Sequence, residues 1–306
     1  MNQDIIYRSR YLKIFSNGAS HPRLGTVVIC FQYRRPDQHL DLPGFAEEFF
    51  DRFQVAAVFV NCATNEWYQY QDLPEALATL RAFVSAWARI VTYGSSMGGY
   101  AALRFASAVG AKRTIAVGPQ YSPRSLVVAG DNRYDALVAQ TQFLHEDSYR
   151  ASAALDNYVV YDPLLKMDER HMMEYRKEAN VVPIRIPCGG HTPTILLAQC
   201  GLLSDFILDL IAGTFCALRF RHVFRRARTS SPEYWKELVD RLLERGRRET
   251  AQRVVEISRV CEKQRRLDRV DSDLAGAELP ILDVENAGVE SSHIWPVGDG
   301  NECGLG

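Results

Sequence analysis

A serine between two glycines is the residue whose setting most strongly suggests chemistry. Ser96 lies in a Gly-x-Ser-x-Gly pattern formed by residues 94–98. Residues 89–93 before it are rich in β-branched and aromatic types, and residues 100–106 after it have a helical pattern. The serine is therefore predicted to stand on a sharp turn between a strand and a helix. Such a turn exposes the hydroxyl, and the first N–H groups of the helix favour negative charge beside it. The setting predicts a nucleophile.

Two further polar groups follow later predicted strands. His191 comes after the apolar run of residues 182–187, and Asp162 ends the run of residues 158–161. Because the carboxyl ends of parallel strands meet at one edge of a sheet, both side chains are expected near Ser96. A histidine can take the serine proton and return it to a leaving group, and a carboxylate can hold the histidine in the required tautomer.

The order Ser, Asp, His along the chain is the order found in α/β-hydrolases. Residues 1–213 resemble a compact bacterial, esterase-like serine hydrolase of that superfamily, on the serine stretch of residues 94–99 and on the glycine pair before His191. The resemblance implies an α/β-hydrolase fold and a Ser-His-Asp triad built on Ser96 and His191.

Two aspartates compete for the place of the triad acid. Asp162 is the first choice, because the turn of residues 162–164 resembles the acid turn of the family, although the usual preceding glycine is missing. Asp168 is the alternative, and it could instead cap the helix that follows it. Alanine variants of the two residues would distinguish catalysis from stability.

The tetrahedral oxygen of an acyl transfer needs two N–H donors. One is predicted to be the backbone N–H of Met97, directly after the nucleophile. The second is predicted in the loop after Phe31, from Gln32 or Tyr33, and this loop lacks the His-Gly-Gly-Gly string of many esterases.

The loop of residues 61–72 is unusually aromatic. Its Trp67 and Tyr68 are candidates for lining a substrate pocket, and packing within the loop is the alternative. The sequence has no metal-ligand cluster, phosphate-binding loop or dinucleotide fingerprint. No cofactor and no metal are expected, since a serine triad needs neither.

The elements that must position these groups alternate along the chain. Continuous apolar runs, typical of strands buried on both faces, are separated by helical patterns, which predicts a mostly parallel sheet flanked by helices. This α/β-hydrolase domain is predicted over residues 1–213, with residues 119–156 as a small lid. The expected strands are residues 5–7, 11–15, 26–31, 55–60, 89–93, 113–118, 158–161 and 182–187, and the expected helices include residues 43–53, 73–87, 134–143 and 168–179.

Composition limits the class of protein. Of 306 residues, 47% are hydrophobic and 24% charged, and the net charge is −1, which gives no reason to expect nucleic-acid binding. The seven cysteines are odd in number and none are spaced Cys-x-x-Cys, which indicates a reducing compartment. No secretory signal is recognised, and polar residues interrupt the apolar stretch of residues 195–220. A cytoplasmic protein without a membrane span is expected.

The last third of the chain has a different pattern. Residues 214–267 are predicted to form an all-α extension with a helical hairpin that turns at Gly246 and resembles a single tetratricopeptide repeat. One such unit cannot bury its own apolar faces, so it is expected to cover the hydrolase domain, bind a protein partner or form a homodimer. Residues 268–306 are acidic and are predicted to be a partly extended or disordered tail.

The function predicted from sequence is a serine hydrolase that acts on a carboxylic ester of a small-molecule or acylated substrate. Acyl transfer to a sugar hydroxyl or thiol is the nearest alternative, since it uses the same residues, and a peptidase or thioesterase shares the triad chemistry. A non-catalytic scaffold protein with this fold is the alternative from another class. A fluorophosphonate probe would distinguish an enzyme from a scaffold.

Overall fold

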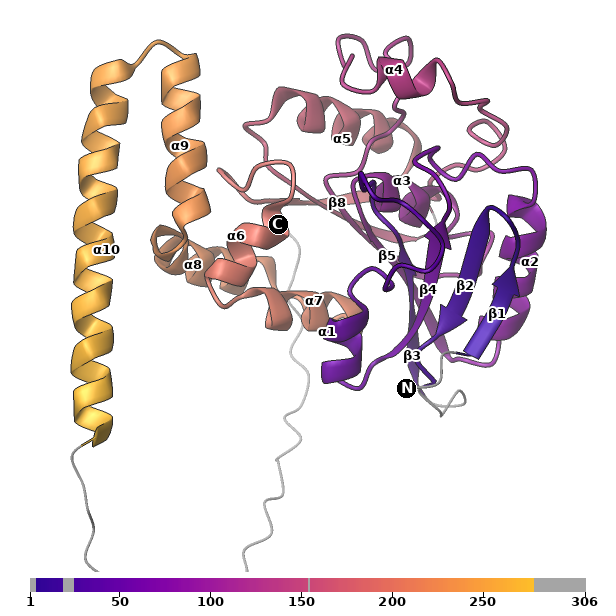
Figure 1. Ribbon diagram of the computed structural model, residues 1–306, viewed down its shortest axis with the longest axis horizontal. Coiled ribbons are helices and arrows are strands. Elements are labelled where there is room, and N and C mark those ends of the chain that lie inside the picture. The colour runs from indigo at the N-terminus through magenta and orange to yellow at the C-terminus, as the bar shows by residue number, and fades with distance from the viewer. Residues whose placement is uncertain (1–3, 19–24, 154, 278–306) are drawn as a thin grey trace, which may run out of the picture. The chain divides into compact units, whose positions relative to one another are not determined.

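The computed structural model describes residues 4–18, 25–153 and 155–277, and these contain an eight-stranded sheet (Figure 1). Each strand lies at or beside a predicted one. The strands are β1 Asp4–Arg8, β2 Leu12–Ser16, β3 Thr26–Phe31, β4 Ala56–Cys62, β5 Arg89–Ser95, β6 Arg113–Val117, β7 Asp156–Tyr161 and β8 Val181–Arg185.

The sheet is mostly parallel. Its order is β1-β2-β4-β3-β5-β6-β7-β8. Strands β1 and β2 pair antiparallel with each other, and β2 pairs antiparallel with β4. The pairs from β4 through β3 to β8 are all parallel, so their carboxyl ends share one edge. The central strands are buried on both faces, as their continuous apolar runs predict.

Helices cover both faces of this sheet (Figure 1). The predicted fold class, a mostly parallel sheet flanked by helices with an all-α extension, is confirmed. The helices are α1 Glu47–Arg52, α2 Leu73–Val84, α3 Met97–Arg104, α4 Asp135–Val138, α5 Lys166–Glu178, α6 Pro193–Gln199, α7 Leu203–Ala212, α8 Ala217–Ala227, the 3-10 turn η1 Arg228–Ser230, α9 Pro232–Glu244 and α10 Arg248–Ala277.

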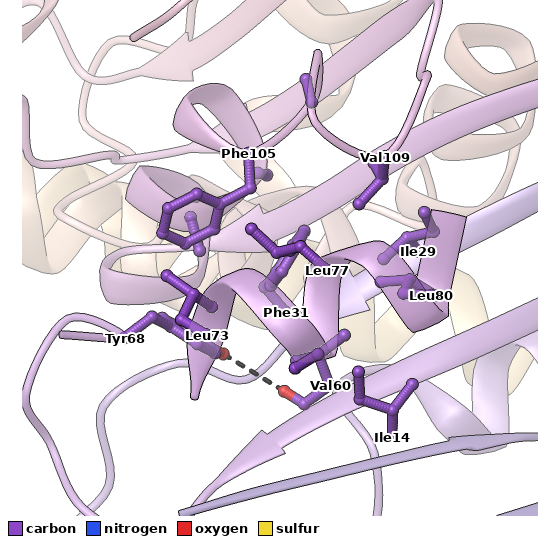
Figure 2. Close-up of a cluster of buried hydrophobic side chains, with 14 of the residues drawn as sticks. Ile14, Ile29, Phe31, Val60, Tyr68, Leu73, Leu77, Leu80, Phe105 and Val109 are labelled. Atoms are coloured by element: carbon purple, nitrogen blue, oxygen red, sulfur yellow. Dashed lines mark hydrogen bonds between the residues drawn. The ribbon is translucent and has the colours of Figure 1, made fainter. Parts of the chain in front are cut away.

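One face of the sheet packs against α2 and α3. Leu73, Leu77 and Leu80 of α2 recur at spacings of four and three, so they share one side of the helix and lie on the apolar side chains of the sheet (Figure 2). Phe31 of β3 contributes to the same cluster, in which the hydroxyl of Tyr68 reaches the carbonyl of Val60 (Figure 2). Each buried leucine contributes about 1.5–3 kcal/mol of hydrophobic free energy. This packing fixes the strand that leads to Ser96.

The opposite face packs against α1, α6 and α7. Phe206, Ile207, Leu210 and Ile211 form the buried side of α7 and lie against the sheet. Among the described residues no single helix is long and apolar enough to cross a membrane, and one pair, α6 with α7, meets that criterion only when taken together across a bend of 118°.

Three predicted helices are shorter than expected, and one of them, α2, ends at Val84 rather than at residue 87. The pattern of residues 134–143 gives only the single turn α4, and the pattern of residues 43–53 gives only α1. Ala46, which precedes α1, has a φ of 61°, a left-handed conformation that cannot continue a helix. The segment of residues 119–153 is otherwise irregular, apart from α4.

The described part of the extension consists of α8, η1, α9 and α10. Ser231 caps α9 by accepting the Tyr234 N–H at 3.2 Å, and Gly246 turns the chain with a φ of 71°. The sequence places the start of a partly extended tail at residue 268, and α10 continues past that position to Ala277. Residues 278–306 lie outside the described residues.

The chain divides into two units, residues 1–263 and 264–306. The sheet and helices α1 to α9 belong to the first unit. The assignment of residues 1–213, 119–156 and 214–267 to a hydrolase domain, a lid and a hairpin that binds a partner stays a prediction.

Candidate active site

The serine turn has the strained backbone that the motif predicts. Ser96 lies between β5 and α3 with a φ of 54° and a ψ of −119°. Its N–H donates to the Val117 carbonyl at 2.8 Å, which fixes the turn against the neighbouring strand. A Cβ at Gly94 would collide with the Gly98 carbonyl, and a Cβ at Gly98 would collide with the Phe31 carbonyl. Both positions therefore require glycine.

His191 lies directly beside the serine. Its Nε2 is 3.0 Å from the Ser96 Oγ, and its Nδ1 is 2.7 Å from Oδ2 of Asp168. The Asp168 side chain is almost fully buried, whereas that of His191 is 31% exposed. The three side chains form one hydrogen-bonded row that ends at the half-buried serine hydroxyl.

The carboxylate beside His191 belongs to Asp168, so the sequence preference for Asp162 is wrong. Asp162 does end β7 as predicted, but its Oδ2 is 2.7 Å from an Arg241 guanidinium nitrogen of α9. The same oxygen accepts the Gly190 N–H at 3.1 Å, and Oδ1 accepts the Leu164 N–H at 2.9 Å. These bonds commit both oxygens of Asp162 to other partners.

Burial sets the electrostatics of Asp162. Removal from water raises the pKa of its carboxyl, while the N–H groups of Leu164 and Gly190 and the charge of Arg241 act in the opposite direction. Arg241 also donates to Glu237 of the same helix at 3.0 Å. A buried ion pair thus links α9 to the turn that carries His191.

Asp168 is held by a second network that sequence reasoning missed. Arg133 donates to Asp168 Oδ1 at 3.3 Å and pairs with both oxygens of Asp131 at 2.7 and 2.8 Å. Asp131 Oδ2 lies 2.7 Å from His171 Nε2. His171, on the same helix as Asp168, is fully buried. Its spacing of three residues from Asp168 places both on one side of α5 and is the signal that could have found it.

Gln120 is a further missed residue. It follows β6 at the same sheet edge and is fully buried. Its Nε2 donates to the Ser96 Oγ at 3.0 Å, and its Oε1 accepts from Trp67 Nε1 at 3.4 Å. The rule that selected Asp162 and His191, a polar residue after a buried strand, applies equally to Gln120.

The predicted oxyanion donors differ in their availability. Met97 begins α3, so its N–H belongs to the first turn, which has no intrahelical acceptor. The Gln32 N–H is committed to the Val60 carbonyl at 3.2 Å. Within the described part of the chain, the Tyr33 N–H contacts only the side-chain oxygen of Gln32, at 3.2 Å. Tyr33 therefore suits the second donor position better than Gln32.

Trp67 and Tyr68 are both fully buried and both have a positive φ, of 47° and 60°. The Tyr68 hydroxyl donates to the Gln32 carbonyl at 2.9 Å, beneath the candidate oxyanion loop. Trp67 packs edge-on against Tyr134 and contacts Gln120 beside the serine. A direct role for either residue in substrate binding stays a prediction.

The site has the groups for nucleophilic acyl chemistry: a hydroxyl, a base beside it and a carboxylate behind the base. No group of three or more His, Cys, Asp or Glu side chains suited to a metal ion is found among the described residues.

Comparison with known proteins gives similarity in fold only. No family model and no curated protein matches the chain. Solved structures with similar folds include the capsule O-acetyltransferase of Neisseria meningitidis serogroup A, with 12% identity, a TM-score of 0.48, and 67% of this chain and 93% of that chain covered.

Two others are hydrolase-fold proteins. A thermophilic carboxylesterase cloned from a metagenomic library has 13% identity and a TM-score of 0.45, and the match covers 71% of this chain and 92% of that one. Alpha/beta hydrolase domain-containing protein 10 from mouse has 13% identity and a TM-score of 0.44, with 70% and 100% covered. Scores this low say nothing about activity. The strand order and the serine turn of this chain are those of an α/β-hydrolase fold.

Proposed function

We propose that this protein is a serine hydrolase that cleaves a carboxylic ester through an acyl-enzyme on Ser96. The observation that carries the proposal is the unbroken row from Ser96 Oγ to His191 Nε2, and from His191 Nδ1 to Asp168, at 3.0 and 2.7 Å. The strained backbone at Ser96 supports it, because such strain is kept where it serves a site.

The roles follow from the chemistry of each group. The Ser96 Oγ attacks the ester carbonyl carbon while its proton passes to His191 Nε2. Asp168 stabilises the resulting imidazolium through Nδ1–H. The N–H groups of Met97 and Tyr33 are the proposed donors to the tetrahedral oxygen. When the C–O bond to the alcohol breaks, His191 gives its proton to the leaving oxygen.

Water completes the cycle. His191 takes a proton from the water that attacks the acyl-enzyme carbonyl, a second tetrahedral species forms, and the bond to Oγ breaks as the proton returns to Ser96. The products are one carboxylic acid and one alcohol. Gln120, which donates to Oγ, is proposed to position the hydroxyl for attack.

A fluorophosphonate probe tests the nucleophile. Attack by Oγ displaces fluoride, and intact-mass and peptide mass spectrometry locate the adduct. We expect one adduct, on Ser96, none in Ser96→Ala, and normal labelling in Ser95→Ala, whose side chain is buried on the same turn. If the folded wild-type protein is not labelled, or if labelling survives Ser96→Ala, the proposal is wrong.

Hydrolysis and acyl transfer differ in the molecule that accepts the acyl group from Ser96, which is water in hydrolysis and an alcohol in acyl transfer. With 4-nitrophenyl acetate as acyl donor, an added sugar alcohol leaves the rate and the acetate yield unchanged if water is the acceptor. Acetylated sugar formed at the expense of acetate would instead identify an acyltransferase with the same three residues.

A further inference from the structure

A cavity of about 650 Å³ lies along β8, the last strand of the sheet order, away from the serine site. The end of α5, the strand β8, helix α8 and η1 form its walls. Five arginines line it: Arg176, Arg185, Arg221, Arg225 and Arg228. None of its lining residues is an aspartate or glutamate.

None of the five arginines of this cavity forms a salt bridge within the described residues, although the charge of Glu169 acts on Arg185 at longer range. Arg219, on the same helix α8 but outside the cavity, pairs with Asp209 at 3.0 Å. No salt bridge joins Arg176, Arg221 or Arg225 to a carboxylate in the part of the chain that the structure describes. Several uncompensated guanidinium groups around one cavity repel each other, and an anion would relieve that repulsion.

Two of the five arginines are held in place by neutral groups. Arg185 donates to the Tyr161 hydroxyl at 3.3 Å, and the Arg228 guanidinium lies 5.1 Å above the Tyr234 ring. The Nε of Arg228 is buried and has no hydrogen-bond partner among the described residues. A buried donor without an acceptor is unfavourable, and an anion bound in the cavity would supply the missing acceptor.

The cavity also has an aromatic wall. Phe215, Phe220 and Phe224 line it, and the rings of Phe220 and Phe224 stack with centroids 5.8 Å apart. Phe224 is 4% exposed, so its ring is part of the protein core and forms a firm base. The cavity therefore presents cations and an apolar surface together.

We propose that this cavity binds a soluble phosphate ester with an apolar or aromatic body. A phosphate monoester carries nearly two negative charges and three acceptor oxygens, which match guanidinium forks in geometry as well as charge. The organic part of the ester packs on the phenylalanine wall. The volume is that of a small-molecule site, and the concave shape suits a soluble ligand better than a flat lipid surface. The cavity is separate from Ser96, so the proposal that it binds a phosphate ester does not depend on the proposal that the protein is a hydrolase.

Isothermal titration calorimetry with phenyl phosphate tests the site at fixed ionic strength. Inorganic phosphate and benzoate serve as reference ligands. We expect phenyl phosphate to bind at least about 10-fold more tightly than either, since only it offers both a phosphate and a ring.

The matched variants lie on one helix. The double variant Arg221→Gln/Arg225→Gln is expected to weaken phenyl phosphate binding at least about 10-fold, while Arg226→Gln, outside the cavity, leaves it within about twofold. All three arginines are exposed, so the fold is expected to survive, and circular dichroism melts check this.

Three results would overturn the proposal. One is the absence of saturable phenyl phosphate binding below about 10 mM. Another is an equal loss in Arg226→Gln and in the double variant. The third is sedimentation with phosphatidylglycerol vesicles but not phosphatidylcholine vesicles, without binding of the soluble ester, which would make the cavity part of a membrane-binding surface.

Discussion

Two buried aspartates, six residues apart in the chain, have partners of different kinds. Asp168, in the first turn of α5, faces His191 and also accepts from Arg133. Asp162, at the end of β7, faces Arg241. A histidine can accept a proton and become a cation, whereas an arginine is always charged. Of the two aspartates, only Asp168 faces a side chain whose charge can change in this way.

The comparison teaches that a position after a strand does not by itself assign the acid. Asp162 occupies the expected position, yet its oxygens hold the backbone of the histidine turn and a permanent cation. Asp168 lies instead in the first turn of the following helix α5, the end of a helix at which negative charge is favoured. The side chain that each aspartate faces, a histidine for Asp168 and an arginine for Asp162, distinguishes the two positions.

The largest expected effect concerns the coupling between His191 and Asp168. His191→Ala is expected to lower kcat for 4-nitrophenyl acetate by about 10⁵-fold, because no base remains beside Ser96. Adding Asp168→Asn should then change kcat by less than about threefold, since triad members act as a unit. A further large loss in the double variant would show that Asp168 does not act through His191.

Arg241 tests the structural aspartate. Arg241→Met leaves the buried Asp162 charge without its cation and is expected to lower the free energy of unfolding by about 3–5 kcal/mol in urea titrations. The value of kcat should remain within about tenfold of the wild type, because Asp168 still faces His191.

A double-mutant cycle is the control for this pair. Asp162→Asn in the Arg241→Met background should add little further destabilisation, since both charges are then gone and their coupling is lost. Strictly additive losses in unfolding free energy would contradict the ion pair between β7 and α9.

Arg133 tests the support of Asp168, the proposed triad acid. Arg133→Met removes one charged donor from Asp168 and is expected to lower kcat by about 10- to 100-fold, the equivalent of one charge-assisted hydrogen bond, with KM nearly unchanged. Arg133→Lys should recover part of the loss. A change confined to KM would instead place Arg133 in substrate binding.

Glu237 is expected to give the smallest effect. It accepts from Arg241 at 3.0 Å, but Arg241 keeps its bond to Asp162 when Glu237 is replaced. Glu237→Gln should therefore lower the free energy of unfolding by only about 0.5 kcal/mol and leave kcat unchanged. A loss of unfolding free energy as large as that of Arg241→Met would show that Glu237, and not Asp162, is the main partner of Arg241.

Much of this site is predictable because it follows from local patterns. The structure brings Ser96 and His191 together, and this proximity could be predicted because each follows a recognisable strand and parallel strands bring their ends together. The need for glycine at positions 94 and 98 can also be predicted from the local sequence, because the turn leaves no room for a Cβ there. The strand order then confirms what alternation along the chain predicts.

The identity of the acid is not a local property. Asp162 is bound by Arg241, which lies 79 residues later in a helix whose packing the sequence does not specify. Asp168 accepts a hydrogen bond from Arg133, and Arg133 lies in an irregular segment whose sequence has no helical or strand periodicity. The buried state of His171 depends on the same segment through Asp131. Such long-range pairings appear only when the chain is folded.

The comparison of Asp168→Asn with Asp162→Asn tests the central claim most directly. Both variants remove one charge and keep the shape of the side chain, and kcat for 4-nitrophenyl acetate is measured for both at the same pH, with urea unfolding alongside. We expect Asp168→Asn to lower kcat by about 10³- to 10⁴-fold and Asp162→Asn by less than about tenfold, with the larger loss of stability in Asp162→Asn. The reverse order of the two kcat values would contradict the assignment of Asp168 as the acid behind His191.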